Sequence, residues 1–209
     1  MYNMYNIMRP RRRRSFIGCL VSLLIIGGIL SFFVYKFEFG GVITMHDHPT
    51  VVVDECTGYV HVTVGTSSNQ VRMQGLAGGF TSYSYNQNRN QVILNGCNLS
   101  LQVPPTTDLI LNADHIEVFG VSGKMTISAN GGSIVLMHST LQGASTIDNN
   151  GGPIIFNGAL DTHSNPTISD NGGSIDMTLA RSVAFHLDAT GIILSLIHIS
   201  EPTRQAEIS

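Results

Sequence analysis

Apolar residues recur at nearly constant intervals over the second half of the chain. Isoleucines that follow a Gly-containing turn are 20 and 21 residues apart, and an earlier isoleucine lies 18 residues upstream. Two positions after each of them comes another apolar residue, while the residue between varies in polarity. That alternation indicates β-strands with one inward face. The first apolar column is Ile116, Ile134, Ile154 and Ile175.

Two further apolar columns share this period. Three columns per unit of about 20 residues predict stacked coils, because a single coil cannot bury its own apolar side chains but neighbouring coils share a core. We therefore expect an all-β fold, a β-solenoid of the parallel β-helix type with coils of about 18–21 residues. The second column is Leu111, Ile127, Ile147, Ile168 and Leu187; the third is Val121, Leu141, Leu160 and Leu179.

The turn between strands reads Asn-Gly-Gly in three successive units. Asn tolerates left-handed backbone conformations and Gly adopts them at little cost, so this triplet reverses the chain sharply. If the coils stack in register, the Asn side chains lie above one another and are expected to share amide hydrogen bonds. The predicted turns are Asn130, Gly131 and Gly132; Asn150, Gly151 and Gly152; and Asn171, Gly172 and Gly173.

The region before the repeats, residues 51–104, is also predicted to be β but less regular. The stretch SYSYNQNRNQVILNG indicates a hairpin around a polar, Asn-rich turn. The two prolines of VPPTTDLIL mark the link into the regular coils.

Composition supports this fold class and adds a charge asymmetry. Only 12% of residues are charged, Trp is absent and Gly occurs 22 times, as in an all-β chain with many turns. Five Arg lie within the first fourteen residues, whereas residues 37–193 contain four basic and twelve acidic residues. An acidic domain disfavours binding to nucleic acid, which requires a basic face.

The Arg cluster precedes an apolar segment. Residues 16–35 read FIGCLVSLLIIGGILSFFVY, twenty residues without a charge, enough to cross a hydrocarbon core of about 30 Å. The positive-inside rule then places the N-terminus in the cytoplasm. We expect a cytoplasmic tail at 1–14, a single anchor at 15–36, a linker at 37–49 and an extracytoplasmic domain at 50–193. A cleaved signal peptide is the alternative, but its apolar region is usually shorter.

Several of these stretches resemble a bacterial family of adhesin-like proteins with β-strand repeats. The likeness lies in the anchor, the link VPPTTDLILNADHIEVFGVSGKMTI, the turn–strand units and FHLDATG, and covers roughly residues 50–191. Members commonly carry Asp-Ser-Gly where this chain has Asn-Gly-Gly. The resemblance implies an extracytoplasmic β-solenoid in surface adhesion or envelope association, and it supplies no catalytic residues.

Residues 194–209, LSLIHISEPTRQAEIS, break the repeat abruptly. They resemble the in-frame translation of a transposase-type sequencing adapter. Such segments are excluded from fold reasoning. We expect the natural sequence to depart from this one near residue 193.

The candidate metal ligands are few. His46, Asp47 and His48 carry imidazole and carboxylate groups that bind metals. No third or fourth ligand follows at a recognisable spacing, so a solvated linker is the favoured interpretation, and we predict no metal and no cofactor.

Five acidic residues raise the question of catalysis. Glycoside cleavage needs two carboxylates about 5–10 Å apart, and coils stacked at about 4.8 Å could bring Asp148 near Asp170. Both residues also stand at the Asn-Gly turns, where Asp is a common turn former. No nucleophile elbow and no phosphate-binding loop is present. The five residues are Asp114, Glu117, Asp148, Asp170 and Asp176.

Cys56 and Cys97 are the cysteines outside the apolar segment. An oxidising location and an even count permit a disulfide between them. Two separate thiols are the alternative.

These features together predict a non-catalytic, membrane-anchored, extracytoplasmic β-repeat protein. The expected role is cell-surface adhesion, envelope scaffolding or the binding of a cell-surface polymer. The first alternative is a lyase or hydrolase that acts on polysaccharide through a groove lined by carboxylates. The second is envelope-stress sensing, with the Arg-rich tail in contact with anionic lipid.

Overall fold

The computed structural model describes residues 40–75 and 80–179. Of these residues 67% are in strands and 2% in helix, and the strands belong to one sheet, so the predicted all-β class is confirmed. In this part of the chain no helix has both the length and the apolar character needed to cross a membrane. The predicted tail (1–14), anchor (15–36), Leu187 and residues 194–209 lie outside the described residues.

The described elements are short strands and one 3₁₀ turn. They are β1 Gly40–Thr44, β2 Thr50–Val64, β3 Gln70–Gly75, β4 Phe80–Asn86, η1 Gln87–Arg89, β5 Gln91–Gly96, β6 Leu99–Val103, β7 Asp108–Phe119, β8 Ser122–Gly123, β9 Met125–Ala129, β10 Ile134–Leu141, β11 Thr146–Asn149, β12 Ile154–Leu160, β13 Thr167–Asp170 and β14 Ile175–Leu179.

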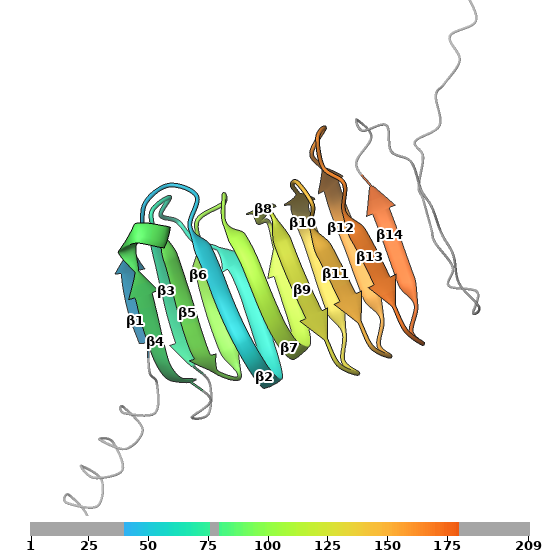
Figure 1. Cartoon of the computed structure of the whole chain (residues 1–209), viewed down its shortest axis with the longest axis horizontal. Coiled ribbons are helices and arrows are strands. Elements are labelled where there is room, and N and C mark those ends of the chain that lie inside the picture. The colour runs from blue at the N-terminus through green and yellow to red at the C-terminus, as the bar shows by residue number, and fades with distance from the viewer. Residues whose placement is uncertain (1–39, 76–79, 180–209) are drawn as a thin grey trace, which may run out of the picture. The chain divides into compact units, whose positions relative to one another are not determined.

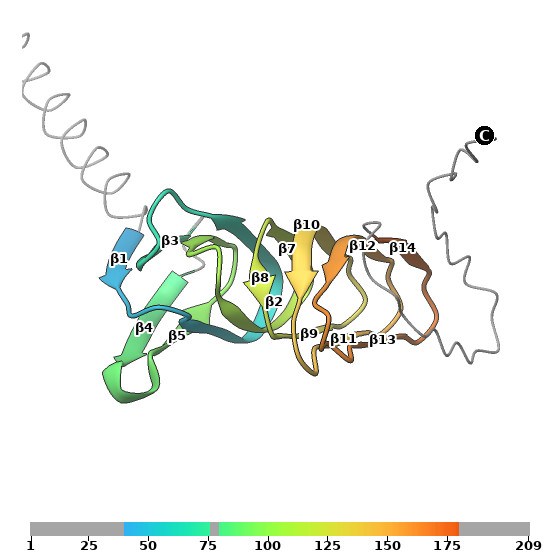
Figure 2. The ribbon, with the colours of Figure 1, turned by 90° about the horizontal axis from the view of Figure 1, so that it is seen from above.

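The main path through the sheet is β1-β3-β6-β2-β7-β10-β12-β14 (Figure 1). From β6 onward its neighbours are parallel, whereas β1, β3 and β6 pair antiparallel. Strands β9, β11 and β13 form a second parallel run. Figure 2 shows this run along one side and β10, β12 and β14 along the other. The apolar core lies between the two runs.

The first two predicted columns are in register. Ile134 pairs with Ile116 on one side and with Ile154 on the other, and Ile154 pairs with Ile175. On the opposite run, Leu111, Ile127, Ile147 and Ile168 occupy successive register positions. The intervals of 18, 20 and 21 residues therefore each span one crossing from a strand to its parallel neighbour.

The third predicted column is only partly correct. Leu141 pairs with Leu160, but it also pairs with Gly123 rather than Val121, and Leu179 pairs with Gly158. A bulge lies in the pairing of β10 with β12, where β10 contains one extra residue between Met137 and Ser139, and it brings Leu141 opposite Leu160. That extra residue, His138, has a positive φ of 55°.

Each Asn-Gly-Gly turn uses its two glycines differently. Gly151 has a φ of +106°, in the left-handed region that favours Gly. Gly152 is required by close approach, because a Cβ there would lie 1.8 Å from the carbonyl oxygen of Gly132 in the preceding repeat. The turns at Gly131–Gly132 and Gly172–Gly173 repeat both features.

The Asn ladder expected from in-register stacking is present. Asn150 Nδ2 donates to Asn130 Oδ1 at 3.1 Å, and Asn171 Nδ2 donates to Asn150 Oδ1 at 3.2 Å. These side chains are exposed, so the ladder stabilises the edge of the stack rather than its core.

The residue before each ladder Asn points inward, and its identity differs between repeats. Asn149 Nδ2 donates to the carbonyl oxygens of Gly132 (2.9 Å) and Gly152 (2.8 Å). Asp170, in the next repeat, pairs with Asn149. A carboxylate has no N–H to donate, and both Asp170 oxygens are buried without a hydrogen-bond partner in the described structure. A buried polar group of this kind weakens the fold.

The predicted linker at 37–49 is wrong for its described part. Gly40–Thr44 forms β1 and pairs antiparallel with β3. Ile43 and Met45 are buried, with 8% and 4% exposure, because they alternate inward and cover the end of the core. The hairpin predicted from the Asn-rich turn is confirmed as β4, η1 and β5.

Candidate functional site

The outward positions of five parallel strands form a continuous surface, which we call the mixed face. These positions alternate with buried residues such as Val60 and Val62, so they point away from the core. One row crosses β2, β7, β10, β12 and β14 as His61, Glu117, Val135, Ile155 and Asp176. The neighbouring row is Thr63, Phe119, Met137, Asn157 and Thr178.

At the β2–β7 end of the mixed face, three side chains share hydrogen bonds. The Tyr59 hydroxyl donates to Glu117 Oε2 at 2.5 Å. His61 Nδ1 lies 3.1 Å from the same oxygen and 3.2 Å from the Tyr59 hydroxyl. All three side chains are half-buried. Burial and the bond to Glu117 raise the pKa of Tyr59 from 10.0 to about 12, so the hydroxyl stays a donor at neutral pH.

Aromatic rings continue from this cluster across the surface. The Tyr59 and His61 rings are stacked with centroids 6.0 Å apart, and His61 is tilted against Phe119 at 5.4 Å. Beyond β7, the row of Glu117 continues with the aliphatic residues Val135 and Ile155, of which Ile155 is 37% exposed, and the row of Phe119 continues with Met137, Asn157 and Thr178. The arrangement offers flat ring and aliphatic surface beside a carboxylate and an imidazole.

The geometry around Glu117 does not provide a glycosidase pair with Asp176. Both residues stand in one row, but Val135 and Ile155 lie between them. Three strand spacings of about 4.8 Å put Glu117 and Asp176 about 14 Å apart across the sheet. Glycoside cleavage needs two carboxylates about 5–10 Å apart.

Asp148 and Asp170, considered as a possible carboxylate pair, do not face each other. Asp148 pairs with Ser169, which donates to Asp148 Oδ1 at 2.9 Å, and Asp170 pairs with Asn149. Because successive residues of a strand point to opposite faces, Asp148 faces outward and Asp170 inward. Asp114 is half-buried beside the Gly132 turn. These acids are therefore scattered over both faces and the interior.

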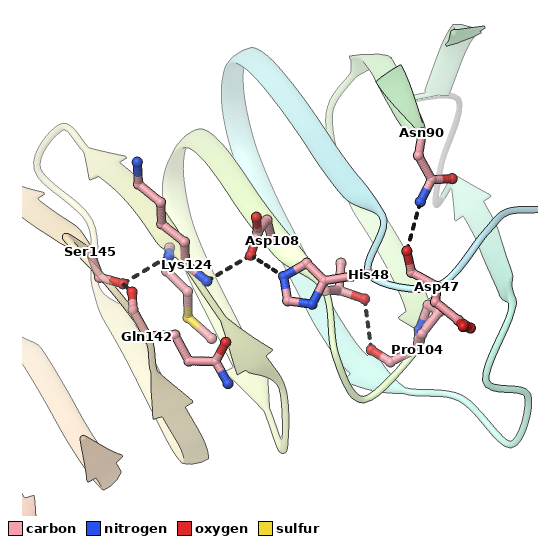
Figure 3. A network of polar contacts seen from close by, with 10 residues as sticks. Asp47, His48, Asn90, Pro104, Asp108, Lys124, Gln142 and Ser145 are labelled. Atoms are coloured by element: carbon pink, nitrogen blue, oxygen red, sulfur yellow. Dashed lines mark hydrogen bonds and ion pairs between the residues drawn. The ribbon is translucent and has the colours of Figure 1, made fainter. Parts of the chain in front are cut away.

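The segment His46–Asp47–His48 is folded against the domain rather than being a free linker. The His46 backbone N–H donates to Asn90 Oδ1 at 2.9 Å, and Asn90 Nδ2 donates to the carbonyl oxygens of His46 and Asp47, each at 3.2 Å. His48 Nε2 lies 3.0 Å from Asp108 Oδ1 (Figure 3). Over residues 40–75 and 80–179 no three His, Cys, Asp or Glu side chains gather as a metal site.

Asp108 extends this network into the repeats. Its Oδ1 also accepts the Lys124 backbone N–H at 2.8 Å (Figure 3). In the next repeat, Ser145 Oγ accepts the Met125 N–H at 3.0 Å and donates to the Gln142 carbonyl at 2.8 Å. These bonds satisfy backbone groups where strands begin, so the network is structural.

The two cysteines are free thiols in this structure. Cys56 is buried in the core, with 3% exposure, whereas Cys97 is half-buried at its edge. Burial, reinforced by the hydrogen bond to the Cys97 thiol, raises the pKa of Cys56 from 9.0 to about 12. The two thiols are neighbours, and the disulfide that the sequence permits between them stays a prediction.

Tyr59 and His61 were not among the functional residues predicted from the sequence. The alternation in TGYVHVTV places both on the face opposite Val60 and Val62, which is a usable signal. Their partner Glu117 is 58 residues from Tyr59, and its position beside them depends on the pairing of β2 with β7.

Comparisons with models of protein families, with curated proteins and with solved structures gave no match for this chain. The likeness to adhesin-like proteins with β-strand repeats stays a prediction.

Proposed function

We propose that the chain is a membrane-anchored, extracytoplasmic β-solenoid that binds an extended cell-surface polysaccharide through the mixed face, without catalysis. The observation that carries this proposal is the cluster of Tyr59, His61 and Glu117 next to Phe119 on an outer sheet surface. The in-register parallel pairing of Ile116, Ile134, Ile154 and Ile175 supports the solenoid.

The chemistry of the mixed face suits a sugar chain. Aromatic rings carry negative potential on their faces, which attracts the C–H groups of a pyranose ring. Glu117 and His61 supply polar atoms for sugar hydroxyls beside those rings. Exposed apolar surface rimmed by polar residues is typical of an interaction site. A sheet surface of this kind favours shallow, repeated contacts over a deep pocket.

The remaining features concern location. The Arg-rich tail and the uncharged segment at 15–36 support a single-pass anchor with a cytoplasmic N-terminus. The bulk of the chain then lies outside the membrane, in surface adhesion or envelope scaffolding. No role for nucleic acid or for a cofactor enters this proposal.

A pair of charge substitutions tests the mixed face. The full chain in lipid vesicles is assayed for sedimentation with insoluble cell-wall polysaccharide. Ile155→Glu, on β12, is expected to weaken binding about tenfold, equivalent to about 1.4 kcal/mol, because it buries a charge under the ligand. Thr146→Glu is the matched control, exposed on β11 on the opposite side. Equal binding by both variants and the unsubstituted chain would overturn the proposal.

The same incubation tests the enzyme alternative. The soluble fraction is analysed for released oligosaccharides with new reducing ends or unsaturated termini. We expect none above the level of a Glu117→Gln variant. Release that disappears in that variant would replace the binding proposal with a polysaccharide-cleaving activity.

A further inference from the structure

The two cysteines stand beside each other because of the strand pairing around them. Asp54 of β2 pairs with Asn95 of β5, and Val60 of β2 pairs with Leu99 of β6. Between these pairs β2 has five residues and the partner segment has three, so β2 bulges. Cys56 lies inside that bulge, and Cys97 is the central residue of the partner segment.

The two segments lie close together within the bulge, and the thiols of Cys56 and Cys97 share a hydrogen bond. A Cβ placed on Gly58 would lie 3.3 Å from the Cβ of Cys97. The Tyr59 N–H donates to Asn98 Oδ1 at 3.4 Å. Neighbouring strands run about 4.8 Å apart, and a disulfide needs a Cα separation of about 4.4–6.8 Å.

Both side chains also point to the same side of the sheet. Cys56 belongs to the buried core, and Cys97 is packed against that core from its edge. A strand neighbour on the opposite face could not be bridged without movement of the backbone.

We infer that Cys56 and Cys97 are a site of covalent cross-linking, at which a small external disulfide converts the two thiols into one intramolecular disulfide. The bridge joins β2 to the connection between β5 and β6. It holds the bulge that contains Tyr59 and from which β2 continues to His61. This inference does not depend on the proposed polysaccharide binding.

The reaction proceeds by two exchanges. The thiolate of Cys97, the more exposed residue, attacks one sulfur of the oxidant; the oxidant's S–S bond breaks and one small thiolate leaves. The thiolate of Cys56 then attacks the Cys97 sulfur, and the second small thiolate leaves. The two protein thiols are oxidised, the external disulfide is reduced to two thiols, and these take up the two protons.

Burial of Cys56 sets the order and pace of these steps. Its thiol is protonated at neutral pH, since its pKa is about 12, so the second exchange is the slow one. The thiolate fraction of such a group rises about tenfold per pH unit. We expect the intermediate, with the small thiol on Cys97, to persist longer at pH 7 than at pH 9.

The test uses the full chain purified in detergent under reducing conditions, then incubated with glutathione disulfide. Intact mass and peptide mapping without reductant follow the products. We expect the final product to lose two hydrogens and to yield a peptide linking Cys56 to Cys97. Cys56→Ser is expected to retain one glutathione on Cys97, whereas Cys97→Ser remains unmodified at Cys56 while folded.

Two results would overturn the inference. One is a stable glutathione adduct on the unsubstituted chain at pH 9 with no cross-linked peptide. The other is no reaction at either cysteine in the folded chain. Thermal unfolding supplies a second readout: the oxidised chain is expected to unfold about 5–10 °C higher than the reduced chain, and the two serine variants show no such difference.

Discussion

The repeats from β7 to β14 and the region from β1 to β6 share one sheet but are built by different means. From β7 onward each described pairing is parallel, and equivalent residues stack on one another. Before β7, antiparallel and parallel pairs are mixed. The single long strand β2 pairs with three others, β5, β6 and β7. A parallel stack repeats one solution to packing and turning, whereas the first region depends on contacts that occur once.

Turn chemistry shows the contrast most directly. In the repeats the chain reverses at Gly residues that lie against the preceding repeat, as Gly152 lies against Gly132. In the first region Asn90 and Asn98 take positive φ values of 47° and 52°, and the Asn90 side chain bonds to a distant segment. The repeats are therefore sensitive to added atoms at turns, and the first region to the loss of individual polar groups.

The largest expected effect is on the core of the repeats. Phe156→Ala removes a fully buried ring and is expected to lower the free energy of unfolding by about 4 kcal/mol, measured by urea denaturation. Ile155→Ala, the adjacent outward residue, is the control and should cost under about 1 kcal/mol. Similar losses from both would mean that the inward and outward sides of β12 are assigned wrongly.

The next effect separates the two glycines of one turn. Gly152→Ala places a methyl group against the Gly132 carbonyl and is expected to cost about 3 kcal/mol. Gly151→Ala meets no atom within 4 Å and should cost about 1–2 kcal/mol, through its positive φ alone. Thermal unfolding of the two variants gives the ranking, and a reversed ranking would contradict the close approach of the coils.

A stabilising change is expected at Asp170, which occupies the position that Asn149 holds in the preceding repeat. Asp170→Asn supplies the N–H donors that Asn149 uses one coil earlier, and should raise the free energy of unfolding by about 1 kcal/mol. Asp148→Asn, exposed and outward, is the control and should change stability by less than about 0.5 kcal/mol. Unfolding curves in urea test both. A destabilised Asp170→Asn variant would show that the carboxylate has a partner of its own.

The smallest effect concerns pH and the first region only. Folding raises the pKa of Cys56 from 9.0 and of Tyr59 from 10.0, each to about 12. Above pH 9 the unfolded chain therefore binds fewer protons than the folded one, and stability falls as pH rises toward 12. Tyr59→Phe should flatten this decline between pH 10 and 12. Unfolding by urea at several pH values measures the slope of the free energy of unfolding against pH. An unchanged slope in Tyr59→Phe would show that Tyr59 does not cause the decline.

Much of the repeat could be predicted from sequence because its signals are local. Each Asn-Gly-Gly triplet lies within one unit and predicted a turn. The spacing of Ile134, Ile154 and Ile175 relates neighbouring units, and it predicted the register of the parallel strands and, with it, the Asn ladder. The all-β class follows from the same alternation. The period did not predict the bulge at His138, since one extra residue in β10 leaves the spacing of the first column unchanged.

The tertiary structure alone decided which distant segments meet. Tyr59, His61 and Glu117 come together because β2 pairs with β7, and β1 covers the core because it pairs with β3. Asp148 is aligned with Ser169, and Asp170 is aligned with Asn149, one position further along the strand. Asp148 therefore points outward and Asp170 into the interior. Periodicity and turn chemistry act between near neighbours in the chain. Strand pairing depends on the burial of the whole core, which no short stretch of sequence encodes.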